Sequence, residues 1–245
     1  MKKKINTALP ALSRMGVLLL IIVMGVIIDP SFLSLRNISN NLANASILII
    51  LGVGETVAII TNGPDLSAGS IMTMGGVVTA ILLKNYQIHF VVAILGGLAV
   101  GALLGAINGY MIAYIKIPAF ISTYGLQWAV FGFAYVVLNG YVIYSFDDAF
   151  RFIGNGTVFK YFSMTTVCMM VIAVIGTLLL KHTTLGRKFY SVGSNAVQAN
   201  MSGIDSKKVI MKAFVFSGLM SAAAGILYQR VVNHQFCMGH HDPPV

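Results

Sequence analysis

Few side chains in this sequence are suited to chemistry, and the clearest of them lie in or beside long apolar runs. Glu55 lies inside one run. Burying a carboxylate in a bilayer costs about 2.5 kcal/mol or more, so Glu55 should face a partner helix or a polar cavity, or be neutral and hydrogen-bonded. Asp65 and Ser67 follow a break at Asn62-Gly63-Pro64. Their oxygens suit two roles: accepting hydrogen bonds from the N–H groups of the next helix, or lining a polar cavity.

Glycine recurs at every fourth position of a later run, and an amide lies beside it. The glycines are Gly97, Gly101, Gly105 and Gly109. Positions four apart share one face of a helix, so this stripe predicts close approach by another helix. Asn108, next to the stripe, is a candidate for a polar solute pathway.

The next run contains a further polar group. Thr123, Gln127 and Trp128 are candidates for contact with the same solute, and Gln127 is the one uncharged amide of its run. Trp and Tyr also gather at membrane interfaces, so anchoring in the interfacial belt is an equal alternative for Trp128 and Tyr124.

The sequence contains no pattern for covalent chemistry that we can defend. A phosphate loop, an HExxH motif and a CxxC pair are all missing. Residues 237–242 (CMGHHD) have the types of metal ligands, but nothing upstream completes a closed site, so we expect no metal and no cofactor. An intramembrane enzyme would need such a site, and a self-powered secondary transporter should show inverted repeats, which are not visible.

The composition indicates which elements must position these residues. The chain is 57% hydrophobic and 9% charged, whereas soluble domains are about 25% charged. The net charge of +9 is spread between apolar runs rather than gathered in a patch, so we expect lipid and not nucleic acid as the surrounding partner. We therefore predict an all-α transmembrane bundle forming a single domain over residues 1–245.

Seven apolar runs approach the ~20 residues that span a bilayer. They are residues 11–28, 42–60, 66–83, 90–115, 120–138, 164–180 and 213–232. A polar loop should separate the first two and extend to Asn41. With a cytoplasmic N-terminus, most of the 16 basic residues fall in inner segments, as the positive-inside rule requires.

Residues 181–212 form the most basic segment between two runs, with six Lys or Arg against the single acid Asp205. The positive-inside rule makes it a cytoplasmic loop. Ser194 or Asn195 can cap a short helix that continues to Met201, and Gly203 can end it. Such a helix is suited to docking of a partner protein. The equal alternative is that the segment is only a solvated connector between two spans.

Several ordered segments together resemble one family, the permease subunits of ribose/xylose/galactose-type ABC sugar importers. Residues 61–70 (TNGPDLSAGS) resemble its Gly-Gly-Ile-Asp-Leu-Ser-Val-Gly-Ser signature, and residues 105–109 (GAING) match its Gly-x-x-Asn-Gly. Residues 117–125 (IPAFISTYG) are similar to its Pro-x-Phe-Ile-x-Thr-Leu-Gly. Residues 186–195 (GRKFYSVGSN), with Ala199 and 202–204 (SGI), resemble its cytoplasmic coupling segment.

The resemblance implies a transport subunit, not an enzyme. Such permeases pair in the bacterial inner membrane, receive sugar from a periplasmic binding protein and are driven by a separate cytoplasmic ABC ATPase. On this basis the substrate pathway would include Asp65, Ser67, Asn108, Thr123, Gln127 and Trp128. The contacts that couple the chain to the ATPase would be Gly193, Asn195, Val197, Ala199, Met201 and Gly203.

The sequence departs from the family in two places. Asn62 and Pro64 replace the usual Gly and Ile of the signature. Family members continue with further spans after the helix that contains residues 222–227, whereas residues 233–245 match nothing in the family, so we expect a C-terminal truncation. The related branched-chain amino-acid permeases are the alternative family, and the Asp-Leu-Ser motif favours sugar.

Overall fold

The computed structural model describes residues 16–17, 19–138, 157–158 and 162–238. The chain divides into two units, residues 1–42 and 43–245, which are described separately. The tail motif at residues 237–242 lies outside the side chains that the structure describes, as does most of the loop before residue 162.

In the first unit, an apolar helix at Leu19–Ile28 is followed by a 3₁₀ turn, η1 (Pro30–Leu33), and by the start of α2 (Leu35–Ile60). The predicted polar loop up to Asn41 is therefore wrong, because α2 begins at Leu35. Local hydrogen bonds favour this early start. The Ser34 hydroxyl accepts the backbone N–H of Asn37 at 3.3 Å, and the Asn37 amide donates to the Phe32 carbonyl at 2.8 Å.

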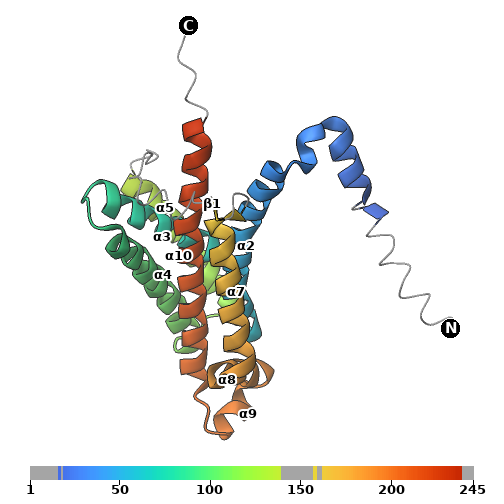
Figure 1. Cartoon of the computed structure of the whole chain (residues 1–245). Coiled ribbons are helices and arrows are strands. Elements are labelled where there is room, and N and C mark those ends of the chain that lie inside the picture. Colours follow the sequence, from blue (N-terminus) through green and yellow to red (C-terminus); the bar gives the residue numbers. More distant parts are fainter. Residues whose placement is uncertain (1–15, 18, 139–156, 159–161, 239–245) are drawn as a thin grey trace, which may run out of the picture. The chain divides into compact units, whose positions relative to one another are not determined.

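The second unit is a bundle of long helices (Figure 1). After α2 come α3 (Ala68–Lys84), α4 (Phe90–Ala113), α5 (Ala119–Leu138), α7 (Met164–His182), α8 (Thr184–Ser194), α9 (Ala196–Met201) and α10 (Ser206–Met238). Two short antiparallel strands, β1 (Thr157–Val158) and β2 (Phe162–Ser163), precede α7. Five of the described helices are long and apolar enough to cross a membrane, while α3 and Leu19–Ile28 are shorter. The predicted helical membrane bundle is confirmed, with five to seven spans.

Helix α10 is the most enclosed of these spans. Of its apolar window, 56% is buried inside the protein, against 22% for α4, α5 and α7. It packs along both α3 and α4 (Figure 1). The large exposed apolar faces of the other helices are the surface that a bilayer would cover.

The glycine stripe of α4 is where α10 comes closest, as the periodicity predicts. A methyl group placed on Gly101 would lie 2.5 Å from the Gly218 carbonyl oxygen, and one on Gly109 would lie 2.9 Å from Cα of Met211. Both distances are below van der Waals contact, so only glycine allows the two backbones to approach this closely.

The basic segment is shorter and more ordered than expected. Helix α10 begins at Ser206, not near 213, because its basic residues Lys207, Lys208 and Lys212 are all exposed and leave the packed face apolar. The Asp205 carboxylate accepts the backbone N–H of Lys208 at 3.2 Å and so caps the first turn. Helix α8, which we did not predict, occupies the start of the segment.

Candidate functional site

The break between α2 and α3 is a turn held inside the protein. Along residues 61–67 buried and exposed positions alternate, with Asp65 and Ser67 among the buried ones. Asn62 has φ of 62° and so lies in the left-handed region, which asparagine tolerates better than most residues. The turn therefore directs the Asp65 carboxylate inward at the point where two helices end.

Six side chains around this turn form what we call the buried polar network: Glu55, Asp65, Ser67, Asn108, Ser122 and Ser217. Oδ1 of Asp65 accepts the Ser67 hydroxyl at 2.6 Å and the Ser67 backbone N–H at 3.0 Å. Its Oδ2 accepts the Ser217 hydroxyl at 2.8 Å. The carboxylate of Asp65 thus joins the α2–α3 turn to α10.

The network continues through an amide to α4 and α5. The Asn108 amide donates to the Ser67 hydroxyl oxygen at 2.8 Å, and its carbonyl oxygen accepts the Ser122 hydroxyl at 3.1 Å. Asn108 is fully buried, and Ser122 is 2% exposed. In a low-dielectric interior such bonds are directional and costly to break, so they fix the relative positions of four helices.

Glu55 joins the network from α2. Its Oε1 accepts the backbone N–H of Asp65 at 3.0 Å. Its Oε2 is buried and has no hydrogen-bond partner among the residues that the structure describes. Of the predicted surroundings of Glu55, a partner helix or a polar cavity, the described residues show neither directly: its hydrogen-bond partner is the α2–α3 turn. Whether Glu55 is neutral stays a prediction.

The structure brings together four of the six predicted pathway residues. Asp65, Ser67 and Asn108 lie in the network, and Thr123 lies beside it, where its hydroxyl donates to the Ala119 carbonyl at 2.8 Å. Gln127 is half-buried further along α5. Trp128 is 60% exposed and lies between the rings of Tyr124 and Phe131, which places it on the outer face of α5.

Two members of the network were missed from the sequence. Ser122 lies within residues 117–125, which resemble a family motif, but at a position that the motif leaves unspecified; Ser217 has no motif around it. One signal was present for Ser217, which precedes Gly218, a glycine that the close packing of α4 and α10 requires. Serine beside glycine within an apolar run is a pattern of helix contacts in membranes.

The second candidate region, here named the α8–α9 segment, covers residues 184–201. The predicted short helix is confirmed as α9, and Asn195 is its cap: its side-chain oxygen accepts the N–H groups of Val197 and Gln198 at 3.0 and 3.1 Å. Gly203 follows with φ of +79°, the left-handed conformation expected of a helix stop.

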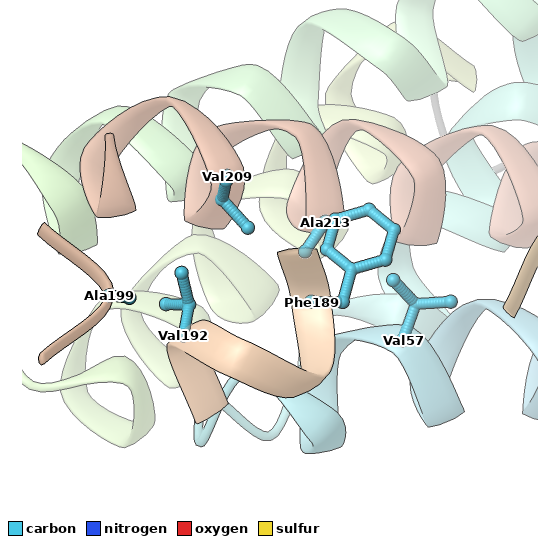
Figure 2. Packing of buried hydrophobic residues seen from close by; sticks show 6 residues of the cluster. All are labelled: Val57, Phe189, Val192, Ala199, Val209 and Ala213. Carbon is cyan, nitrogen blue, oxygen red and sulfur yellow. The ribbon is translucent and has the colours of Figure 1, made fainter. Parts of the chain in front are cut away.

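The α8–α9 segment packs on the bundle through one face only. Phe189 and Val192 of α8 and Ala199 of α9 are buried against Val57 of α2 and Val209 of α10 (Figure 2). The other face leaves Val197 69% exposed and Met201 87% exposed. Two large apolar side chains on a capped helix are thus available to a partner.

The described residues hold no group of three or more His, Cys, Asp or Glu that is arranged to bind a metal ion. The side chains of the buried polar network carry hydroxyl, amide and carboxyl groups. Such groups bind a polar solute or hold helices in place.

Comparison with known proteins identifies the family. Residues 37–237 match the model described as branched-chain amino acid transport system / permease component. No solved structure matches the chain.

Three curated relatives are 31% identical to the chain. The galactose/methyl galactoside import permease protein MglC of Haemophilus influenzae matches 85% of this chain and 68% of its own length. The D-allose transport system permease protein AlsC of Escherichia coli matches 85% and 64%, and the ribose import permease protein RbsC of the same species 86% and 66%.

The chain spans about two thirds of the length of these relatives. The family match covers most of the chain, and its apolar helices are long enough to cross a bilayer. The chain therefore belongs to the branched-chain amino acid transport system / permease component family and is a multi-pass protein of the bacterial inner membrane.

Proposed function

We propose that this chain is the membrane-spanning permease subunit of an ATP-binding-cassette importer that moves a monosaccharide inward by alternating access. The observation that carries the proposal is that its relatives are named for the import of sugars, namely galactose, allose and ribose, each at 31% identity over at least 85% of this chain. The subunit performs no covalent chemistry.

The chemistry of the buried polar network supports a neutral substrate over an amino acid. A sugar offers only hydroxyl and ring oxygens, and serine, asparagine and carboxyl groups are suitable partners for these. An amino acid also carries a carboxylate, which needs a cationic or strongly donating partner. The six members of the network include no basic side chain. The family model carries the name of the branched-chain amino acid systems, which remain the second candidate.

The pathway in this proposal runs past Asp65, Ser67, Asn108, Thr123, Gln127 and Trp128. In the described conformation the first four residues are buried; Asp65, Ser67 and Asn108 are hydrogen-bonded in one chain, and the Thr123 hydroxyl donates to the Ala119 carbonyl. Alternating access requires the helices around them to separate, which would free these groups for sugar hydroxyls. Gln127, half-buried on the same helix as Ser122, would then offer a further amide to the sugar.

Coupling to ATP hydrolysis is assigned to the α8–α9 segment. In our proposal Val197 and Met201 enter a groove of a separate cytoplasmic ATPase subunit, while Asn195 and Gly203 fix the two ends of α9. Gly193 and Ala199 hold the segment against the bundle. A periplasmic sugar-binding protein and a second permease subunit complete the assembly.

Uptake measurements test this function. The chain would be expressed with candidate ATPase and binding-protein subunits encoded near it, in cells lacking their own sugar and branched-chain amino acid importers. We expect uptake of radiolabelled ribose, galactose or allose, together with co-purification of the ATPase. Uptake of leucine without uptake of any sugar would establish the amino acid alternative. ATPase binding without uptake of either class would refute the assigned substrates while leaving the subunit role.

A further inference from the structure

One polar contact joins the two candidate regions. The side-chain amide of Asn62, in the α2–α3 turn, donates to the backbone carbonyl of Gly193 at the end of α8, at 2.5 Å. The two residues are 131 positions apart in the chain. Asn62 is exposed, so the bond is not a consequence of burial in the core.

Gly193 has no side chain, which allows its backbone to lie against the backbone of Ile60. A methyl group on Gly193 would overlap the carbonyl oxygen of Ile60, the last residue of α2. The end of α8 therefore lies directly on the backbone at the end of α2. Ile60 and Asn62 bracket the point where α2 becomes the turn.

Asp65, a member of the buried polar network, lies only three positions after Asn62 in the same turn. Gly63, next to Asn62, lies under the ring of Phe214 of α10, where a methyl group would approach within 2.8 Å. Asp65 is bonded through its N–H to Glu55 and through its Oδ2 to Ser217 of α10. A displacement of Asn62 would therefore act on Asp65, which is held by Glu55 of α2 and by Ser217 of α10.

The α8–α9 segment makes further contacts with the bundle. Oδ1 of Asn200 accepts the backbone N–H of Ser206, six positions further along the chain at the start of α10, at 3.0 Å. Phe189, Val192 and Ala199 make apolar contacts, which are non-directional and permit sliding. The bond between Asn62 and Gly193 has a defined direction and length. This bond also connects α8 to the α2–α3 turn, whereas the apolar contacts connect it to the sides of helices.

We propose that Asn62 is a positioning residue that links movement of the α8–α9 segment to the buried polar network through its bond to the Gly193 carbonyl. This inference rests on the proposed function, in which an ATPase moves the segment. It adds a role for Asn62 at a position where the sequence departs from the family signature.

Two variants of Asn62 separate its hydrogen bond from its backbone conformation. Asn62→Gly keeps the left-handed backbone and removes the side chain. Asn62→Asp tolerates the same backbone and keeps the shape of the side chain, but an ionised carboxylate cannot donate. Gln87→Gly is the matched control, because Gln87 is also an exposed non-glycine residue with positive φ, at 51°, in the turn between α3 and α4.

The first readout uses the assembled transporter. We expect both Asn62 variants to bind the ATPase and to keep basal hydrolysis within about twofold of the parent. The stimulation of hydrolysis by loaded binding protein should fall about fivefold, the lower end of usual coupling between sites. A purely structural defect would lower binding, basal hydrolysis and stimulation together. Normal stimulation in both variants, or equal loss in Gln87→Gly, would overturn the inference.

The second readout needs no partner. Amide hydrogen exchange of the purified chain in detergent should become faster at residues 61–67 and 191–195 in both Asn62 variants, but not in Gln87→Gly. Unchanged exchange at residues 61–67 would also overturn the inference, because the turn would then not depend on the bond. If the parent chain binds no ATPase, the proposed function fails and the coupling role fails with it. Faster exchange would then describe a structural contact only.

Discussion

In the buried polar network nearly every polar group is bonded within the protein, whereas the α8–α9 segment exposes two large apolar side chains. Asp65 receives three hydrogen bonds at 3% exposure, and Met201 is 87% exposed. The first region loses stability when a partner is removed. In our proposal, substitutions on the exposed face of the second region weaken association with an ATPase and leave stability nearly unchanged. Stability and association measurements should therefore separate the two regions.

The largest effect is expected from removing the carboxylate at the centre of the network. Asp65→Ala leaves the Ser67 hydroxyl, the Ser67 N–H and the Ser217 hydroxyl without an acceptor. Unsatisfied buried groups cost about 1–3 kcal/mol each, and partial relaxation makes a total of about 3 kcal/mol reasonable. We expect a lower midpoint of thermal unfolding in detergent and loss of uptake. Asp65→Asn retains one acceptor oxygen, so its unfolding midpoint should lie between those of the parent and of Asp65→Ala. A parent-like midpoint for Asp65→Ala would contradict the geometry.

A smaller loss of stability is expected from a substitution at Asn108, and a substitution at Gln127 serves as the comparison. Asn108→Leu removes the bonds to Ser67 and Ser122 and should destabilise the protein by about 2 kcal/mol, lowering uptake as well. Gln127→Leu, at a half-buried position, should lower uptake with little change in unfolding. Both variants are to be measured by uptake normalised to membrane abundance. If Gln127→Leu transports normally, Gln127 is not on the pathway.

At the α8–α9 segment we expect substitutions to affect association with the ATPase more than stability. Met201→Asp changes a highly exposed residue, so unfolding should shift by no more than about 0.5 kcal/mol. Pull-down of the ATPase should weaken about tenfold, as for loss of an apolar anchor, equivalent to about 1.4 kcal/mol. Gly203→Val should act similarly by preventing the left-handed helix stop. Unchanged association in both variants would make the segment a connector.

The smallest expected effect concerns pH and the start of α10. Hydrogen bonds from the backbone and side chain of Lys208 hold the pKa of Asp205 below its usual value. Since the folded pKa is lowered, capping by Asp205 stabilises the helix start above the unfolded pKa and is lost as pH falls through the folded pKa. Amide exchange at residues 207–209, corrected for its intrinsic pH dependence, should lose protection below about pH 4. Asp205→Asn should remove this pH dependence, and if the parent shows none, the cap is inactive.

The sequence predicted the local features of both regions better than their long-range contacts. Asn195, Gly203 and the glycine stripe act through neighbouring backbone or through a fixed helical period, and each was confirmed. Helix α8 was missed because the basic charge of residues 181–212 as a whole indicated a loop, although Phe189 and Val192 lie on one buried face of the helix. The bonds of Asp65 to Ser217 and of Asn62 to Gly193 join positions far apart in the chain, and no local pattern contains that pairing.

The central position of α10 has a consequence for how the protein is made. The glycine stripe of α4 and the second oxygen of Asp65 are complete only when α10 lies against them. The ribosome produces α10 last among the described helices. Until α10 is in place, the glycine face of α4 lacks the backbone that packs against it and Oδ2 of Asp65 lacks its bond from Ser217. The close packing of the earlier helices is therefore completed by the helix that is synthesised after them.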